Sequence, residues 1–492
     1  MVIIDVYNER KKNVFSFFFL SLMFTTKGRK MRRHFMAVLG TGKYSECEYV
    51  FEGKGVITPY IQIGVLEMCV GKITKEDRIS IFITEKAKES NWIGEGKLEE
   101  LLQKKYPDIN IEAVPIVEGR TPEELDTLFD SIYNQISENE EVYFDITHGL
   151  RNIPMQVLAI LNYARVLKNI KIAGIYYGAY ELKTKEEGDM FYKSPVFDLK
   201  KYSDTLNWTS AAEAFVNTGN CKMMKNLHNE KSRQIQKMWA VESNAEKKKM
   251  LETERDEYKK IGKVLDGLND LTSCLNTGRG KNFPDLKGKN AQCSIKGAYQ
   301  EFADGMKDID KDDLDKIKQL KPLFQKVQED IAEFENAKTD GEVGIAAAKW
   351  ALDKKLTQQG YTALEETIKT VVCEEYGIPA ENEHGRDRIV GSCIKTFAAK
   401  IGEFKGDREK VYGEWKTNYT RGLSDESIEK GKEIIFTISK KYAQLAYNVS
   451  QVRNNMNHFG FQNDSRSYLK LEDSYKKHYE EFKSFESVRE EE

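Results

Sequence analysis

Short apolar runs alternate with amphipathic stretches over the first 200 residues of the chain. The runs typical of strands are Phe35–Leu39, Arg78–Ile83, Ile111–Val117, Glu141–Ile146, Lys171–Tyr177 and Phe191–Leu199. The stretches between them with helical character are Tyr60–Val70, Leu98–Lys105, Thr121–Ser137 and Ile153–Lys168. Strands separated by helices predict a parallel, Rossmann-like α/β sheet. We expect the last run to be a closing strand in an edge hairpin.

The pattern changes after Leu199, where strand signals stop and a charged helical tract begins. Helical periodicity is clear again over Gly344–Tyr376 and Ile428–Met456. In the second of these the apolar residues that should share one face are Ile434, Ile438, Tyr442, Leu445 and Val449. Glycine, proline and basic residues predict a loop over Gly278–Lys289. The second half of the chain is therefore expected to be all helical.

Length and charge favour several domains. The chain has 492 residues and a net charge of −3. At roughly 100–200 residues per domain, we predict an extension over residues 1–30, a sheet domain over 31–200, a charged helical connector or insertion over 201–340, and a helical domain over 341–492. Because no global basic field exists, any contact with nucleic acid must be local.

The cysteines and the N-terminal residues bear on location. The seven cysteines are scattered and form no C-x-x-C pair, which indicates reduced thiols in a cytoplasmic protein and neither a disulfide framework nor a zinc site. The apolar run Phe15–Phe24 follows basic residues as in a signal peptide, but no small-residue cleavage site follows it. About ten apolar residues are also too few for a bilayer, which needs roughly 20. We expect an extension before Met31 without assigned function, rather than a peripheral membrane contact.

Two loops at predicted strand ends carry polar groups. The first is Leu39-Gly40-Thr41-Gly42-Lys43-Tyr44, whose glycines allow a phosphate to approach the backbone while Thr41 and Lys43 offer donors. The second is Asp145-Ile146-Thr147-His148-Gly149-Leu150-Arg151, which leads into a predicted helix. Thr147, His148 and Arg151 could bind a phosphodiester or a base edge, and Asp145 could orient the loop by accepting its amides.

Each loop also has a purely structural explanation. The first could be a tight turn that needs glycine for its conformation, since it is neither a Walker loop nor a full G-x-G-x-x-G motif. In the second, Thr147 or Asn152 could cap the following helix, with His148 simply exposed.

One segment of the helical half carries residues suited to RNA chemistry. Arg453-Asn454-Asn455-Met456-Asn457-His458 ends a long apolar helix before Gly460. A histidine titrates near neutral pH and can transfer protons at the 2′-hydroxyl or the leaving oxygen, while an arginine stabilises the charged phosphorane. Asn454 would position the phosphate or His458. The same spacing also occurs by chance at Arg29 and His34, and a histidine at a helix end can simply interact with the helix dipole.

The two N-terminal loops together carry a family resemblance. D-I-T-H-G-L-R after one strand and G-T-G-K-Y after the first resemble the CARF sensor domains of type III CRISPR–Cas effectors, over roughly residues 31–200. The resemblance implies a homodimer that binds a cyclic oligoadenylate through Gly40–Tyr44 and Thr147–Arg151, with cyclic tetra-adenylate favoured and cyclic hexa-adenylate next. Two copies of a helix-terminus anion site suit such a two-fold symmetric ring. The segment Tyr177–Tyr180 could add aromatic contacts, although Tyr176 or Tyr177 is better suited to the core.

The helical half resembles the HEPN ribonucleases, whose R-x4–6-H motif is catalytic. The resemblance implies Arg453 and His458 as catalytic residues, Asn454 in support, and no metal or other cofactor for cleavage. Because one arginine and one histidine are a small catalytic set, we expect two copies to meet across a dimer axis, with a higher oligomer also open. The predicted protein is an endoribonuclease of type III CRISPR antiviral defence that cuts single-stranded RNA when cyclic oligoadenylate shifts how the helical halves meet.

Three other functions remain open. A ligand-controlled nucleic-acid-binding regulator without nuclease activity would need a short basic recognition helix, which Lys222–Lys249 does not convincingly provide. An effector acting on DNA would normally need a carboxylate cluster for metal ions, and the second half has no such set on predicted strands. The sensor domain could also degrade its own ligand with help from Thr147 or His148.

Overall fold

The computed structural model describes residues 31–149, 152–280, 294–310, 320–380, 384–459, 461 and 466–489. The predicted extension over residues 1–30, the predicted ligand residue Arg151 and most of the predicted loop Gly278–Lys289 lie outside these ranges. The chain divides into two compact units between Asp204 and Thr205.

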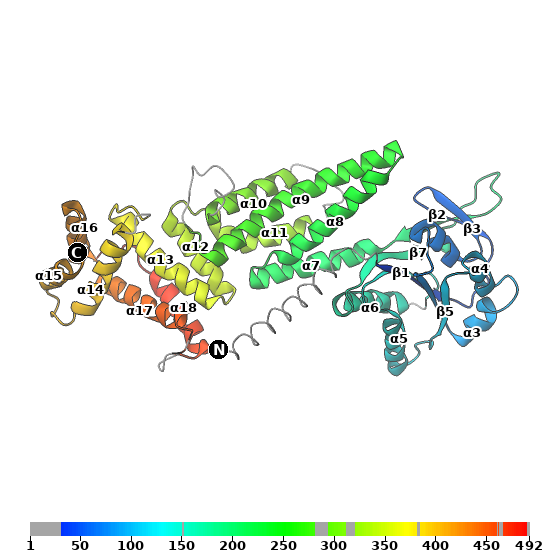
Figure 1. The fold of residues 1–492 in the computed structure, drawn as a ribbon, viewed down its shortest axis with the longest axis horizontal. Coiled ribbons are helices and arrows are strands. Elements are labelled where there is room, and N and C mark those ends of the chain that lie inside the picture. Colours follow the sequence, from blue (N-terminus) through cyan, green and yellow to red (C-terminus); the bar gives the residue numbers. More distant parts are fainter. Residues whose placement is uncertain are drawn as a thin grey trace, which may run out of the picture. The chain divides into compact units, whose positions relative to one another are not determined.

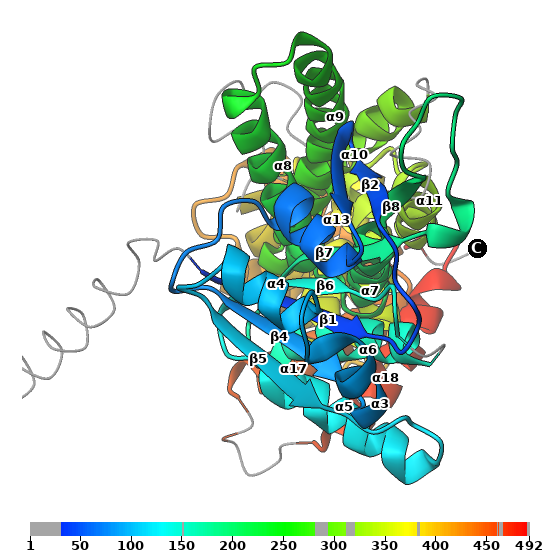
Figure 2. The same ribbon diagram turned by 90° about the vertical axis from the view of Figure 1, so that its right-hand side faces the viewer.

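The first unit is built on one eight-stranded sheet. Its order is β3-β2-β8-β7-β6-β1-β4-β5, which Figure 2 shows from one side. Neighbouring strands are parallel except in the pairs β2–β3 and β7–β8. The strands are β1 Arg32–Leu39, β2 Cys47–Phe51, β3 Lys54–Thr58, β4 Arg78–Ile83, β5 Asn110–Pro115, β6 Glu140–Asp145, β7 Lys171–Gly178 and β8 Lys193–Asp198. The predicted α/β class is confirmed.

Helices cover both faces of this sheet. They are α2 Ile61–Val65, η1 Leu66–Val70, α3 Glu85–Ala87, η2 Lys88–Trp92, α4 Leu98–Lys105, α5 Pro122–Gln135, α6 Ile153–Leu167 and η3 Tyr180–Leu182. Alternation along β1 separates two core layers. Phe35, Ala37 and Leu39 pack with residues of α2 and α4, whereas Met36 and Val38 pack with residues of α5 and α6.

The sheet is larger than the sequence pattern predicts. The β2–β3 hairpin was not predicted, and β8 lies between β2 and β7 rather than at an edge. The physical reason is that β2 pairs in parallel with β8, through residues such as Glu48 and Lys193 that are far apart in the chain. Tyr176 is buried, as expected for a core residue.

The second unit is helical throughout its described residues, apart from an isolated bridge between Ile438 and Arg489. Its helices are α7 Lys200–Thr218, which begins in the first unit, α8 Lys222–Val241, α9 Ala245–Thr277, α10 Ile295–Asp310, α11 Lys321–Asp330, η4 Ala332–Phe334, α12 Asp340–Asp353, α13 Thr357–Glu375, η5 His384–Gly391, α14 Ser392–Lys400, α15 Arg408–Tyr419, α16 Asp425–Thr437, α17 Lys440–Asn457 and α18 Tyr468–Lys483. The predicted all-helical second half is confirmed. None of the helices in the described ranges combines the length and apolar character needed to cross a bilayer.

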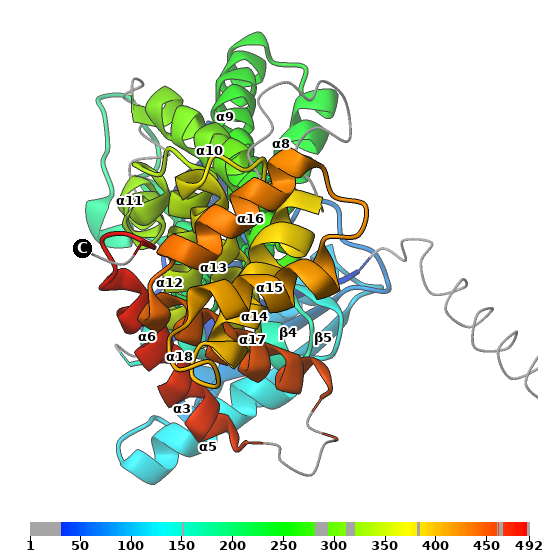
Figure 3. The same cartoon turned by 90° about the vertical axis from the view of Figure 1, so that its left-hand side faces the viewer.

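Two hydrophobic clusters organise these helices. The first joins α7 through α12, and α9 lies alongside α8 and α10 within it (Figure 1). The second joins α12 through α18, and these helices are labelled in Figure 3. Because Trp350 belongs to the first cluster and Ala348 to the second, α12 contributes to both. The helices of the charged tract predicted over residues 201–340 thus bury their apolar faces against one another.

The two long helical patterns of the sequence are each divided in the structure. Gly344–Tyr376 is interrupted near Lys355, which adopts a left-handed conformation with φ of 55° between α12 and α13. Ile428–Met456 is interrupted at Ser439, whose side chain caps the start of α17. The five predicted apolar residues are all buried, but they do not share one helix face. Ile434 lies on α16, Ile438 lies between the two helices, and the other three lie on α17. A bend that preserves the apolar spacing cannot be recognised from periodicity alone.

Candidate functional site

The two predicted ligand loops leave the sheet side by side. Strands β1 and β6 are parallel neighbours, with Ala37 opposite Asp145. Their carboxyl ends therefore lie at the same edge, which is where ligands gather in open parallel sheets.

Gly40 brings the two loops into contact. A Cβ atom at Gly40 would lie 3.0 Å from the Tyr44 hydroxyl oxygen and 3.3 Å from the His148 Cβ atom. The Gly40 amide donates a hydrogen bond to the Tyr44 hydroxyl at 3.1 Å, and the Tyr44 and His148 rings lie 4.6 Å apart. The glycine is thus required for close approach between the loops, a reason that a turn conformation alone does not supply.

Asn91 supports the first loop and was missed by the sequence reasoning. It is 5% exposed in η2, and its Nδ2 atom donates to the carbonyl oxygens of Gly40 at 2.8 Å and Gly42 at 2.9 Å. Its signal in the sequence is weak: a single polar residue in the short segment after β4, with nothing to indicate a partner about 50 positions earlier. Buried bonds of this kind hold a loop in one conformation.

Asp145 and Thr147 order the second loop from within. The Asp145 Oδ1 atom accepts from the Thr147 amide at 3.0 Å and from its hydroxyl, and that hydroxyl accepts from the Gly178 amide at 2.8 Å. Burial raises the pKa of Asp145 to about 6, although the hydrogen bonds from Thr147 act in the opposite direction. The Thr147 hydroxyl is therefore engaged inside the protein, linking β6 to β7.

His148 is partly buried, so the alternative of a simply exposed histidine is wrong. Its Nε2 atom is buried and has no hydrogen-bond partner among the described residues. Burial lowers its pKa to about 4, which leaves the imidazole neutral at physiological pH. The alternative in which Asn152 caps the helix is also wrong, because Asn152 occupies the N-cap position of α6 but its side chain makes no capping hydrogen bond.

The remaining predicted ligand residues surround these groups. Thr41, Gly42 and Lys43 are exposed on the first loop, and Gly149 is partly buried on the second. Tyr180 reaches the same region, because its hydroxyl lies 3.1 Å from the Ser45 hydroxyl, and the Lys183 ammonium lies 3.8 Å from the centre of its ring. The edge therefore combines exposed donors, a cation and aromatic rings.

A serine, a histidine and a glutamate also form a relay within the sheet. The His34 Nε2 atom lies 2.8 Å from the Ser80 hydroxyl, and its Nδ1 atom lies 3.1 Å from Glu140 Oε2. The arrangement matches that of a hydrolase triad. All three residues are at most 1% exposed, however, so no substrate can reach the hydroxyl. This cluster therefore has a structural role and not a catalytic one.

In the helical unit, Arg453 and His458 lie at the C-terminal end of α17. The Arg453 Nε atom is 3.0 Å from Glu365 Oε2, and its Nη1 atom donates to Asn454 Oδ1 at 3.2 Å. His458 is exposed at the C-cap, where its amide donates to the Asn454 carbonyl oxygen at 3.2 Å. Arg453 and Asn454 are thus in contact. No hydrogen bond or ion pair joins these two described residues to the His458 side chain.

Glu365 on α13 is the second residue that the sequence reasoning missed. Its side chain is only 7% exposed, and it also pairs with Lys369 at 3.4 Å. Burial alone would lower the pKa of Lys369, but Glu366, Glu365 and Asp387 outweigh this effect and raise it. The spacing of four residues between Glu365 and Lys369 is a possible signal, because it places them on one helix face.

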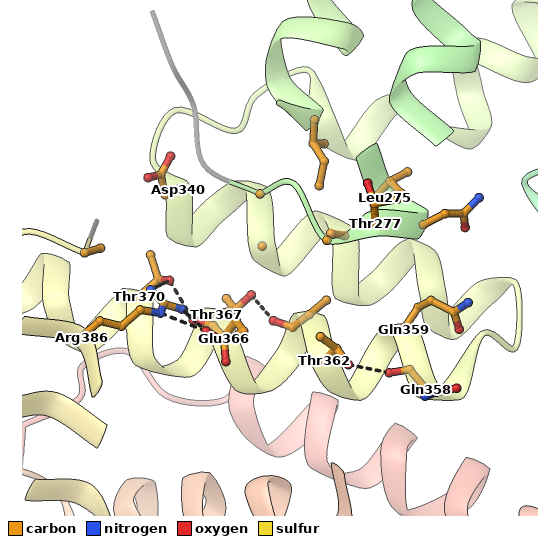
Figure 4. A pocket seen from close by; sticks show the side chains of 18 residues that line it. Leu275, Thr277, Asp340, Gln358, Gln359, Thr362, Glu366, Thr367, Thr370 and Arg386 are labelled. Carbon is orange, nitrogen blue, oxygen red and sulfur yellow. Dashed lines mark hydrogen bonds and ion pairs between the residues drawn. The ribbon is translucent and has the colours of Figure 1, made fainter. Parts of the chain in front are cut away.

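A different face of α13 borders a cavity of about 600 Å³ (Figure 4). Figure 4 shows a row of polar side chains from α13 along it, among them Thr362, Glu366 and Thr370. Arg386 of η5 donates to Glu366 Oε2 at 2.9 Å and to the Thr370 hydroxyl at 2.7 Å. These bonds fix η5 against α13. Across the described ranges, no three His, Cys, Asp or Glu side chains are grouped so as to hold a metal ion.

Two comparisons with known proteins bear on these sites. Residues 34–181 match the family model of the CRISPR system endoribonuclease Csx1, CARF domain. The chain is also 25% identical over 386 residues, or 69% of its length, to the CRISPR-associated protein MJ1674 of Methanocaldococcus jannaschii. It spans 52% of the length of that relative. The family match runs from β1 to η3 and contains both loops that meet at Gly40, so the sheet unit of this chain is similar to the CARF domain of the Csx1 family.

Proposed function

We propose that this protein is a metal-independent endoribonuclease that cuts single-stranded RNA and is activated by a cyclic oligoadenylate in type III CRISPR antiviral defence. The observation that carries the proposal is the CARF domain match in a chain that also presents Arg453 and His458 at one helix end. The ring size favoured by the family resemblance is cyclic tetra-adenylate, followed by cyclic hexa-adenylate.

The ligand would bind at the edge formed by the two loops. Thr41 and Lys43 are exposed donors for phosphates. The Nε2 atom of His148 is buried without a partner among the described residues, and an adenine or ribose group could satisfy it. Asn91 and Thr147 would act as positioning residues, because their polar groups already bond within the protein.

Two features support a homodimer. Exposed apolar side chains lie along α6, including Met155, which is 79% exposed, and Val166. In the helical unit, Phe459 and Phe461 are 81% and 87% exposed beside His458, with their rings 5.8 Å apart. Large apolar side chains gathered on a surface are typical of interaction sites. We propose one dimer contact in each unit, with the RNA site composed of two α17 ends.

The chemistry follows from the groups at that site. One His458 imidazole would take the proton of the 2′-hydroxyl as its oxygen attacks the adjacent phosphorus. The bond from phosphorus to the 5′-oxygen then breaks, and the second His458 of the dimer, in its imidazolium form, would donate a proton to that leaving oxygen. Arg453, held by Glu365, would stabilise the charge on the phosphorane. The products would be a 2′,3′-cyclic phosphate and a 5′-hydroxyl.

The test is cleavage of a fluorescent single-stranded RNA and a matching DNA, in EDTA, with and without cyclic oligoadenylates of each ring size. Wild type should cut RNA only when the cyclic oligoadenylate of the activating ring size is present. DNA should remain intact because it lacks the 2′-hydroxyl. His458→Ala should abolish cutting, whereas Asn457→Ala, a matched change at an exposed neighbour, should retain it. If neither substrate is cut with any ring, the helical unit is a nucleic-acid-binding regulator module instead.

A further inference from the structure

A cavity of about 420 Å³ opens beside the end of α17 that carries Arg453 and His458. Its walls come from α13, η5, α14 and α17, with Tyr419 contributed by the end of α15. The volume falls within the range of roughly 300–1,000 Å³ that is usual for small-ligand sites. The cavity is distinct from the larger one in Figure 4, which borders a different face of α13.

The face of α17 that lines this cavity leads to His458. Tyr447, Gln451 and Asn454 line it at spacings of four and three residues. At 100° per residue, these positions and His458 fall within an arc of about 60° on the helix. The hydrogen bond from the His458 amide to the Asn454 carbonyl oxygen extends the helical register to that residue. The cavity therefore lies on the same face as His458, on the turns preceding it.

The charges around the cavity favour an anionic group at one side. Its carboxylates, Glu365 and Asp387, are both paired with Lys369, and Glu365 is also paired with Arg453. Lys395 on α14 is exposed at the rim and forms no ion pair within the described residues. Its ammonium is available to a phosphate from solution.

The rest of the lining suits a nucleobase. Tyr419 and Tyr447 are half-buried and bring two aromatic rings to the cavity. Single-stranded RNA is commonly bound by stacking of bases on such rings, with polar side chains reading the base edges. Ser450 and Gln451 supply donors and acceptors of this kind from the next turn of α17.

We propose that this cavity is a nucleotide subsite for the RNA substrate, next to the scissile phosphate. The base would stack on Tyr447, and a backbone phosphate would lie at Lys395. Glu365 lines the cavity and also holds Arg453, so the subsite and the candidate catalytic arginine share one wall. This inference rests on the proposed ribonuclease function.

The test measures binding of a short fluorescent single-stranded RNA to full-length His458→Ala protein by anisotropy, with the activating ring present. Adding Lys395→Glu should weaken binding and reduce the slope of log Kd against log salt by about 0.7–1, as expected for one lost phosphate contact. Lys441→Glu makes the same charge change at the far end of α17, outside the cavity lining, and should leave both quantities unchanged.

The base contact is tested in the same assay. Tyr447→Ala should weaken binding by about 5- to 150-fold, which corresponds to the stacking energy of about 1–3 kcal/mol per base. Tyr447→Phe keeps the ring and should bind within about twofold of the parent by the same reasoning. Thermal melting of both variants shows whether the Tyr447→Ala protein is folded. If that protein is unfolded, the Lys395→Glu variant, changed at an exposed residue, tests the subsite instead.

The outcomes separate this inference from the proposed function. If wild type cuts no RNA with any ring, the proposed function fails. Lys395→Glu and Tyr447→Ala are also introduced singly into the protein that keeps His458, and the KM for RNA cleavage is measured. If wild type cuts RNA but Lys395→Glu binds like Lys441→Glu, and both cavity variants in the protein with His458 cut with unchanged KM, only the subsite is overturned and the cavity serves another ligand. Weaker binding in both cavity variants, with the Lys441 and phenylalanine controls unaffected, supports the subsite.

Discussion

Replacing Glu140 by glutamine should destabilise the sheet unit strongly. Glu140 is 1% exposed at the start of β6. Its carboxylate accepts from Arg32 Nε at 2.9 Å, Arg78 Nη2 at 3.0 Å and the Ser137 amide at 2.9 Å, and it is also bonded to His34. Glutamine has nearly the same shape but lacks the charge, so two guanidinium groups lose their counter-ion.

The magnitude follows from the exposure of the partners. Removing one member of a buried ion pair costs about 3–5 kcal/mol. The Arg78 side chain is 14% exposed, whereas that of Arg32 is 44% exposed and can turn to solvent. We therefore expect the free energy of unfolding to fall by an amount at the lower end of this range, about 3 kcal/mol. For a domain of this size, that loss corresponds to a fall in Tm of about 6–12 °C.

The effect should also depend on pH. Burial alone would raise the pKa of Glu140, but the hydrogen bonds from His34, Arg78 and Ser137 outweigh it and hold that pKa well below its usual range. A glutamate in the unfolded chain has a pKa of about 4.3. The pKa of Glu140 is lower in the folded protein than in the unfolded chain. The carboxylate therefore stabilises the folded protein fully at pH values above the unfolded pKa, and this stabilisation is lost as the pH falls below that pKa. The difference between wild type and variant should therefore narrow on lowering the pH through about 4.

Calorimetry of the full chain measures this effect, with Glu141→Gln as the matched control. Glu141 is the next residue on β6 and pairs with Lys171 near the surface, where an ion pair contributes about 0–1 kcal/mol. A Glu140→Gln protein that melts within 2 °C of Glu141→Gln would refute the idea that this carboxylate organises the buried cluster.

Three further predictions concern the two candidate sites. Asn91→Ala should weaken cyclic oligoadenylate binding by about tenfold, since two carbonyl groups of the Gly40 loop lose their donor; calorimetric titration showing unchanged affinity would contradict this. Because burial lowers the pKa of His148 to about 4, ligand affinity should not rise between pH 8 and 5.5; a tenfold rise would indicate an imidazolium at the site. Glu365→Gln should lower kcat for RNA cleavage by about 10- to 100-fold, because Arg453 would be misplaced, and the affinity for cyclic oligoadenylate should not change. Full activity of this variant would contradict the positioning role of Glu365.

The sequence by itself determined the fold classes and located the three segments that carry the candidate sites. Strand-like runs separated by helices were enough to predict the α/β sheet, because alternation and helical spacing report burial within one segment. The loops after β1 and β6 and the end of α17 could be located for a similar reason: each polar cluster is contiguous in the chain, and its position follows from the element before it.

Only the tertiary structure decided which distant residues serve those clusters. Asn91 reaches the Gly40 loop from η2, and Glu365 reaches Arg453 from α13. The hairpin β2–β3 joins the sheet through β8, and the cavity beside α17 is enclosed by five elements. Local periodicity shows that a residue faces inward or outward, but it carries no information about its partner. That partner is decided by packing between segments, where many long-range contacts form together.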